Sequence, residues 1–225
     1  MSAKILSVLC GAMGLLAGCG AAVDGALTQD ELTTTRIVHP NEINKNGVIN
    51  IGLNRDVSIP TTFPASPGNS GGYAMQTGAI ENEGLFAVSG LFAGTNVSPP
   101  PSGSAIYAGT FNLIEITDIE IADNPITGTP EINGERGLQS GDLTLVASFS
   151  NDTIRSTAGS ELTVNGRLIG TDITGIVQYN GIDGSLEGMA GGDQAIGAFH
   201  GEGNVGPGTD DDYMYAGGFI ADRAF

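Results

Sequence analysis

The sequence predicts an all-β protein: a small soluble eight-stranded antiparallel up-and-down β-barrel, preceded by a short irregular or β-stranded handle-like segment. Between residues 104 and 225, apolar and polar residues alternate over several stretches, as they do in strands with one buried face. Turn-forming residues separate these stretches at roughly even intervals. Glycine supplies 36 of the 225 residues, and beyond the N-terminal signal no window has a convincing helical period.

The first residues have the pattern of a lipoprotein signal. Lys4 supplies a positive charge, and residues 5–16 form an apolar stretch that is too short to cross a bilayer as a helix. Leu-Ala-Gly-Cys at 16–19 resembles a bacterial lipobox, in which Cys19 is acylated and becomes the mature N-terminus. The alternative is an ordinary secretory signal with a chance cysteine. We predict a signal peptide over 1–18 and a lipid anchor on Cys19.

The mature chain is expected to begin with a flexible part. Residues 19–35 are small, polar and aperiodic, which predicts a tether between the lipid and the folded protein. Residues 36–103 are expected to form the handle-like segment. Its candidate strands are Val48–Leu53, Tyr73–Ile80 and Leu85–Phe92. The proline-rich run Ser98–Gly103 is a stiff spacer that marks the start of the barrel domain, residues 104–225.

Eight strands are expected in the barrel domain. They are Ile106–Ile116, Gly141–Phe149, Thr153–Ala158, Glu161–Ile169, Asp172–Tyr179, Ile182–Met189, Gln194–Glu202 and Tyr213–Asp222. Asn180-Gly181, between two of them, is typical of a type I′ hairpin. Small residues alternate with large ones on the presumed inner face, which suits a tapered barrel interior. The glycines on that face are Gly175, Gly184, Gly188, Gly197, Gly201 and Gly217, beside Tyr179, Phe199, Tyr215 and Phe219.

The outer face decides between a soluble barrel and a membrane barrel, because a membrane barrel is apolar outside. Arg167, Asp183 and Glu187 are expected to point outward, whereas the apolar residues of the same strands point inward. The chain ends in Phe225, as outer-membrane barrels often do, but a final aromatic residue also caps an ordinary core. The pattern favours the soluble barrel.

Charge and cysteine content exclude several classes of function. Lys and Arg total 8 against 25 Asp and Glu, for a formal net charge of −17, and such a surface repels phosphate groups. We therefore exclude nucleic acid as a partner. Cys10 leaves with the signal and Cys19 carries the lipid, so the mature chain has no disulfide and no thiol nucleophile. No phosphate-binding loop or catalytic carboxylate pair is recognisable, and we expect no cofactor.

Glycine and aromatic motifs in the C-terminal half resemble those of a known family. They are Tyr107-Ala-Gly109, Gly141–Phe149 with a tight turn into Thr153–Thr157, Gly197-Ala-Phe-His-Gly201, and Ala216-Gly-Gly-Phe219 after an acidic gap. Together they resemble the C-terminal barrel of transferrin-binding protein B-like surface lipoproteins, a group that includes factor H binding protein. The resemblance covers about half the chain and implies a lipid-anchored barrel at the cell surface. Transferrin-binding protein B has two lobes, and no ligand-contact motif of the family is matched here, so the resemblance implies no particular ligand.

One motif suggests an enzyme. Gly68-Asn-Ser-Gly-Gly72 matches the surroundings of the nucleophile in trypsin-like serine proteases, and His39 and Asp56 precede Ser70 in the required order. However, only about fifty mature residues precede Ser70, which is too few for that fold. A proline–glycine turn is the simpler interpretation, and we predict that the chain is not an enzyme.

Two groups of residues are weak candidates for binding. His200 and Glu202 share a face of one strand and could contact a ligand or begin a metal site, the alternative being a surface histidine beside a glutamate. Asp210, Asp211 and Asp212 could bind calcium through carboxylate oxygens. No calcium-loop spacing frames these aspartates, so a solvated loop is the alternative for them.

The expected function is that of a binding module, anchored by its N-terminal lipid to the cell outer membrane and either surface-exposed or periplasmic. Its ligand would be an iron- or haem-related molecule, another solute or a host protein. The alternative is a structural or interaction lipoprotein of the cell envelope without a small-molecule ligand. An open apolar mouth of the barrel would favour capture of a solute, whereas a filled interior would not.

Replacing Cys19 with Ala is expected to abolish acylation and to leave the precursor unprocessed by the lipoprotein signal peptidase, because the thiol is the group that takes the lipid. Metabolic labelling with palmitate measures this directly. Equal label in the Cys19→Ala variant and the wild type would contradict the lipid anchor.

Overall fold

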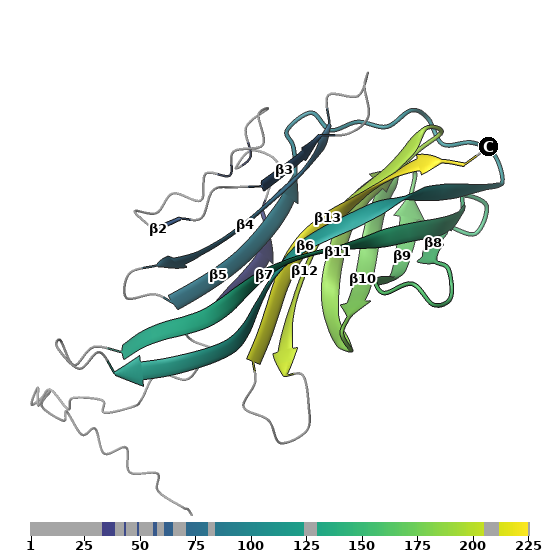
Figure 1. Cartoon of the computed structure of the whole chain (residues 1–225). Coiled ribbons are helices and arrows are strands. Elements are labelled where there is room, and N and C mark those ends of the chain that lie inside the picture. Colours follow the sequence, from purple (N-terminus) through teal and green to yellow (C-terminus); the bar gives the residue numbers. More distant parts are fainter. Residues whose placement is uncertain are drawn as a thin grey trace, which may run out of the picture.

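The computed structural model describes residues 33–38, 43, 49, 56–57, 61–64, 71–80, 84–123, 130–204 and 212–224. These residues form thirteen strands and no helix, which confirms the all-β class. The strands make a closed barrel and an open sheet that lies along one side of it (Figure 1). Within the described ranges, no helix is long and apolar enough to cross a membrane.

The barrel is an eight-stranded antiparallel meander, as the sequence predicts. Its strands are β6 (Ser104–Asp123), β7 (Pro130–Ser148), β8 (Thr153–Ser156), β9 (Thr163–Ile169), β10 (Asp172–Tyr179), β11 (Ile182–Ala190), β12 (Gln194–Asn204) and β13 (Asp212–Arg223). Each strand pairs with the next, and β13 closes the barrel by pairing with β6 from Met214↔Ile116 to Arg223↔Tyr107. Asn180 and Gly181 have positive φ angles of 49° and 82°, which confirms the expected type I′ hairpin.

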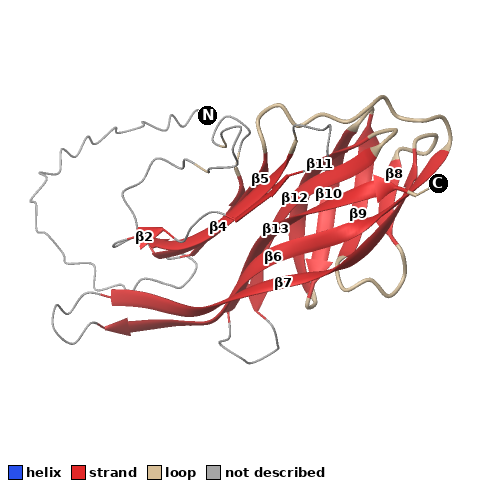
Figure 2. Cartoon of the chain, turned by 45° about the horizontal axis from the view of Figure 1, so that its top comes forward, coloured by secondary structure: helices blue, strands red, loops and turns tan. Residues whose placement is uncertain are grey.

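β6 and β7 extend beyond the strand bounds expected from the sequence. They continue past Ile116 and begin before Gly141, and together they form a two-stranded ribbon that projects from the barrel (Figures 1 and 2). The pairing shifts between Thr117 and Glu120, where Asp118 has a φ of 49°. This bulge interrupts the alternation of apolar and polar residues. The sequence pattern therefore did not predict the outer half of the ribbon.

Side chains fill the barrel interior. The rings of Phe219 and Tyr215 lie across glycines of the neighbouring strand: a Cβ on Gly197 would be 2.4 Å from the Phe219 ring, and one on Gly201 would be 2.5 Å from the Tyr215 ring. The rings also contact one another. Tyr179 lies edge-on to both Phe111 and Tyr215, at ring-centroid distances of 6.0 and 5.9 Å. The mixture of glycine and aromatic residues expected from the sequence therefore makes a packed core.

The open sheet occupies the region expected to be handle-like. Its strands are β1 (Thr33–Ile37), β2 (Asp56–Val57), β3 (Thr61–Pro64), β4 (Gly72–Ile80) and β5 (Gly84–Leu91), in the order β1-β5-β4-β2 with β3 also on β4. β1 runs parallel to β5 and begins within the segment expected to be the tether. The expected strand Val48–Leu53 lies outside the described residues except for Ile49, which makes an isolated bridge to Ile43.

The sheet packs on the outer face of β12 and β13, where the barrel carries small residues. The Tyr73 ring covers Gly218 so closely that a Cβ there would be 2.4 Å from the ring. The Tyr73 hydroxyl accepts a hydrogen bond from Asn112 Nδ2 at 3.0 Å, and the Ser89 hydroxyl donates to the Phe199 carbonyl at 2.7 Å. Leu85, Ala87, Ile116, Ile119, Met214 and Ala216 form one buried apolar cluster in this contact. The sheet is thus fixed to the barrel by both apolar packing and hydrogen bonds.

The proline-rich connection between sheet and barrel is held at the β11–β12 turn. The main-chain N–H and the hydroxyl of Ser98 both donate to the Asp193 carboxylate, at 2.9 and 2.8 Å. Desolvation would raise the pKa of Asp193, but hydrogen bonds from Ser98 and from the main chain outweigh it and lower that pKa. Nearby, the Tyr107 hydroxyl donates to the Gly191 carbonyl at 2.6 Å, and burial raises the pKa of Tyr107 to about 12.

Truncating Phe199 or Phe219 to Ala is expected to lower the free energy of unfolding by about 3–5 kcal/mol, because each ring is fully buried in the barrel. Urea denaturation of the single variants measures the loss. Ile176→Ala is the matched control: its side chain is 50 % exposed, and the expected change is within about 0.5 kcal/mol. Wild-type midpoints for both phenylalanine variants would contradict the inward register of β12 and β13.

Candidate functional site

One side chain on the inner face of the barrel is a hydrogen-bonded carboxylate. Glu115 lies on the inner face of β6, and its two oxygens accept hydrogen bonds from the Tyr213 hydroxyl and from Gln139 Nε2, both at 2.5 Å. Burial, together with the bond to Glu115, raises the pKa of Tyr213, so its phenol stays a neutral donor. Tyr179 packs beside this group and has a raised pKa, mainly through desolvation. These contacts use both carboxylate oxygens internally.

A wider opening lies on the side of the barrel, where β7 separates from the strands that follow it. β7 pairs with β8 only over Leu145–Ser148, and before that stretch the β8–β9 loop stands opposite β7. The space between them, which we call the seam groove, has a volume of about 610 Å³. It is lined by Thr110, Asn112, Ser140, Gly141, Asp142, Gly159, Ser160 and Glu161.

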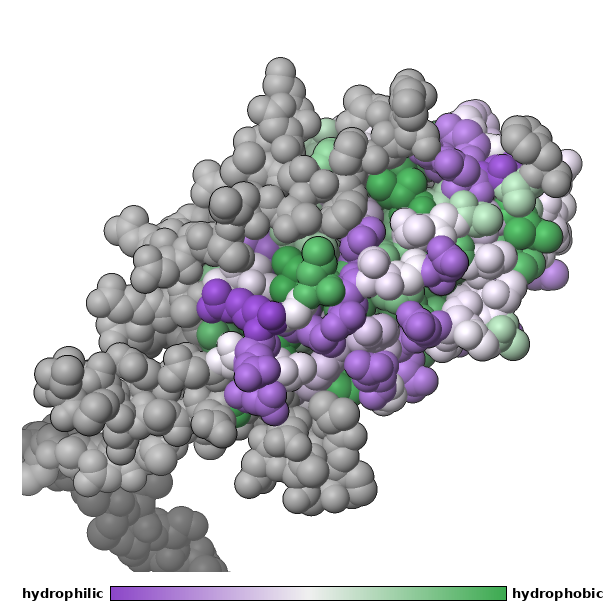
Figure 3. Space-filling model, viewed as in Figure 1, coloured by the Kyte–Doolittle hydropathy of each residue, from purple (hydrophilic) through white to green (hydrophobic). Residues whose placement is uncertain are grey.

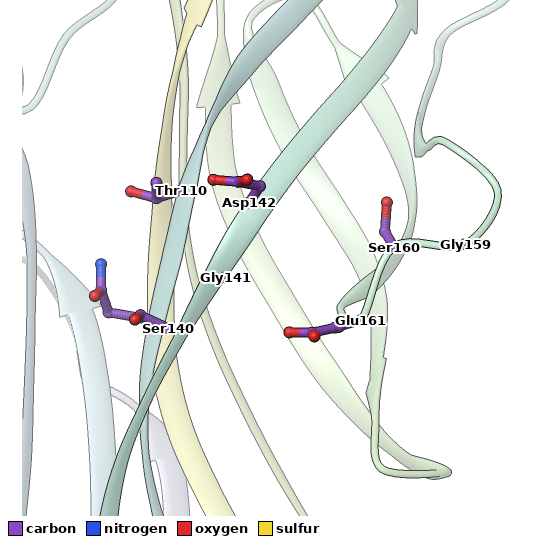
Figure 4. A pocket seen from close by; sticks show the side chains of 8 residues that line it. Thr110, Ser140, Gly141, Asp142, Gly159, Ser160 and Glu161 are labelled. Carbon is purple, nitrogen blue, oxygen red and sulfur yellow. The ribbon is translucent and has the colours of Figure 1, made fainter.

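The chemistry of the seam groove is polar and acidic. Figure 4 shows Thr110 and Asp142 on adjacent strands, with Ser160 and Glu161 across the opening on the β8–β9 loop. The Glu161 carboxylate is directed toward β7, since a Cβ on Gly141 would be 2.8 Å from Glu161 Oε2. Its lining holds two carboxylates, three hydroxyls and one amide, and no basic side chain. Such a lining fits a ligand that carries positive charge or hydrogen-bond donors.

His200 and Glu202 point outward from β12, as the sequence predicts, but the open sheet covers this part of the strand. Glu202 accepts a hydrogen bond from the Thr35 hydroxyl of β1 at 3.1 Å. His200 is half-buried, its Nδ1 has no hydrogen-bond partner among the described residues, and burial lowers its pKa. The interpretation of His200 as a surface histidine is therefore wrong, because β1 and β5 pack on β12. A ligand role for the two residues stays a prediction.

The other sequence candidates are only partly visible. Cys19, Ser70, Asp210 and Asp211 lie outside the described residues, as does His39. Asp56 is in β2, and Asp212 begins β13. Over the part of the chain that the structure describes, no group of three or more His, Cys, Asp or Glu side chains could hold a metal ion.

Sequence reasoning did not find the residues around Glu115 or in the seam groove. Glu115 carried a usable signal, because it falls on the apolar face of its strand, two residues after Leu113. A charged residue in an inward register needs partners, and these are Tyr213 and Gln139. Asp142 and Glu161 carried no such signal in the sequence, because their place in one groove depends on where β7 separates from β8.

Lowering the pH from about 7.5 to about 5.5 is expected to destabilise the wild type more than a His200→Leu variant. The folded-state pKa of His200 lies below its ordinary value of 6.5, so the unfolded chain takes up the proton first. Stability is therefore unaffected above about pH 6.5 and is lost as the pH falls below it. Urea denaturation at a series of pH values measures the difference, and parallel pH profiles for the two proteins would contradict the burial of neutral His200.

Comparison with known proteins gives distant structural likenesses. No family model and no curated protein matches the sequence. Among solved structures, the chain is similar to HpuA from Kingella denitrificans in complex with human haemoglobin, with a TM-score of 0.35 and 12 % identity over 75 % of this chain and 67 % of that chain. The apo haemoglobin receptor HpuA from the same organism gives a TM-score of 0.31 and 11 % identity, with the same coverage. Similarity at this level carries no conclusion about function.

Proposed function

We propose that the chain is a lipid-anchored surface module that binds a protein ligand on its exterior. The observation that carries this proposal is the packed barrel interior. Aromatic rings lie across the inner glycines at distances that leave no space even for an added Cβ, as at Gly197 and Gly201. A solute of cofactor size would have to displace these rings, so the interior is a stabilising core and the outer surface is what remains for binding.

The exterior has the composition of a surface that meets other proteins. The open sheet covers β12 and β13 and also contacts β6 and β7, whereas among the described strands β8, β9 and β10 lie away from it. Hydrophilic residues on the visible face alternate with small hydrophobic patches (Figure 3). One patch comes from Ile106 and Val146, which are direct cross-strand partners and are 49 % and 42 % exposed. Apolar patches with a polar rim are typical of protein interfaces.

The anchor and the location are parts of the same proposal. The lipobox at 16–19 and the polar residues that follow it support a folded domain held at the outer membrane by the lipid on Cys19. An iron- or haem-related ligand would then be presented as part of a carrier protein. Transferrin and haemoglobin are the first probes, because they are an iron-carrying and a haem-carrying protein.

Native mass spectrometry of the mature chain, extracted in detergent and purified from its own host, tests this proposal. We expect the domain to retain no small molecule at equal stoichiometry, because the interior is full, and to form a complex with a protein ligand added afterwards. A retained solute would contradict the exterior mode of binding. Absence of any complex with haemoglobin, transferrin or proteins of the host surface would favour the structural role in the envelope instead.

A further inference from the structure

We propose that the free edge of β7 in the seam groove accepts an extended, basic segment of a partner protein as an added β-strand. This inference rests on the proposed binding function and assigns to it a site and a partner chemistry. In this mode of recognition, main-chain hydrogen bonds supply affinity and the flanking side chains supply selectivity.

The edge follows from the direction of the main-chain groups along β7. Thr144 accepts a hydrogen bond at its carbonyl from the Thr157 N–H at 3.0 Å, so the Thr144 main chain points away from β6. Main-chain groups alternate in direction along a strand, and therefore those of Leu138, Ser140 and Asp142 point to the same side. No strand among the described residues pairs with them there, because β7 meets β8 only from Leu145.

This edge lacks two of the features that usually protect one, a proline and a bulge. Prolines, bulges and inward charges keep strand edges from pairing, and in this ribbon the bulge lies between Thr117 and Glu120 and the proline at Pro130. Residues 137–142 contain neither proline nor a register shift. Within them, Leu138 exposes 61 % of its side chain, the largest value among the exposed large hydrophobic residues. The stretch is therefore open to pairing and carries an apolar contact.

The groove is suited to a single strand. β6 and β7 form one wall and the β8–β9 loop the other, and the groove has a volume of about 610 Å³ (Figure 4). An added strand would lie about 4.8 Å from β7 and would have its outer side against the loop. Pairing with a second copy through the same edge would instead bring the β6 and β7 of that copy against the loop that borders the groove.

Charge selects the kind of segment. Asp142 and Glu161 both line the groove, and no basic residue does. Lys or Arg side chains of the incoming strand could pair with these carboxylates. The chain's own residues 20–32 do not fit, because they contain three acidic residues and no Lys or Arg. The occupant that the groove fits is thus a basic, extended segment of another protein.

Amide hydrogen exchange tests the edge without any substitution. The probe is a set of peptides of about nine residues, selected on the mature chain from a random display library. In the free protein the amides of Leu138, Ser140 and Asp142 are expected to exchange rapidly, while those of Gly141 and Leu143, which face β6, are protected. Bound peptide should slow the first three by about tenfold or more. Unchanged exchange at these amides in a peptide complex would overturn the proposal.

Variants test the geometry and the charge separately. Ser140→Pro removes one edge N–H and is expected to weaken peptide binding by about tenfold or more, whereas Ser140→Ala, the matched control, should change it less than about twofold. Asp142→Asn with Glu161→Gln should weaken binding of Lys- and Arg-containing peptides by about tenfold. Binders that are insensitive to both changes, or selected peptides without basic residues, would contradict the assignment. Self-association of the wild type that Ser140→Pro abolishes would replace the partner segment with a second copy.

The outcomes separate this inference from the proposed function. A protein ligand that forms a complex but leaves the edge amides unprotected overturns the seam groove as the site and leaves the exterior binding function standing. If no protein ligand binds while basic peptides still protect the edge amides, the seam groove is supported as a peptide-binding site and the proposed function as a protein-binding module is contradicted.

Discussion

The barrel depends on aromatic rings that pack directly against glycines of the neighbouring strand. Phe219 covers Gly197 and Tyr215 covers Gly201, and a single methyl group at either glycine would overlap the ring. Each pair gives a closely packed layer where two ordinary side chains would force the strands apart. The same pairs place the other faces of β12 and β13 outward, so that the open sheet has a surface of small residues to pack on. The register of β12 and β13 therefore determines both the packing of the interior and the surface on which the sheet docks.

That constraint also explains why binding falls to the remaining surface. One side of the barrel is covered by the sheet and the interior is full, so β8 to β10 and the parts of β6 and β7 that lie away from the sheet carry the free faces. The chain has a net charge of −17, so its surface is acidic on balance. A partner that approaches them is favoured electrostatically if it is basic, and its association is expected to slow as salt is added.

The sequence was sufficient for the barrel and insufficient for what surrounds it. Strict alternation placed β10 and β11 within one residue of their observed bounds, because each strand has one buried and one solvated face. The alternation pattern did not predict burial where a strand face is covered by a segment distant in the sequence. Ala198, Ala216 and Gly218 have the same small side chains whether they face water or the sheet. The parallel pairing of β1 with β5 joins residues about fifty positions apart, and no local pattern encodes that partner. The seam groove depends on the point at which two strands diverge, which is a tertiary property.

Closure of the barrel by its last strand has a consequence for folding. β6 is the first strand of the meander, and its second neighbour, β13, is formed by residues 212–223, about one hundred positions later. While the chain is being made, β6 through β12 can pair only as an open sheet, with unsatisfied edges on both β6 and β12. Contacts of such sequence separation make folding slow compared with a helical domain of similar size. The incomplete sheet is therefore the species most exposed to aggregation, and loss of only the final dozen residues is expected to leave the whole meander in that state.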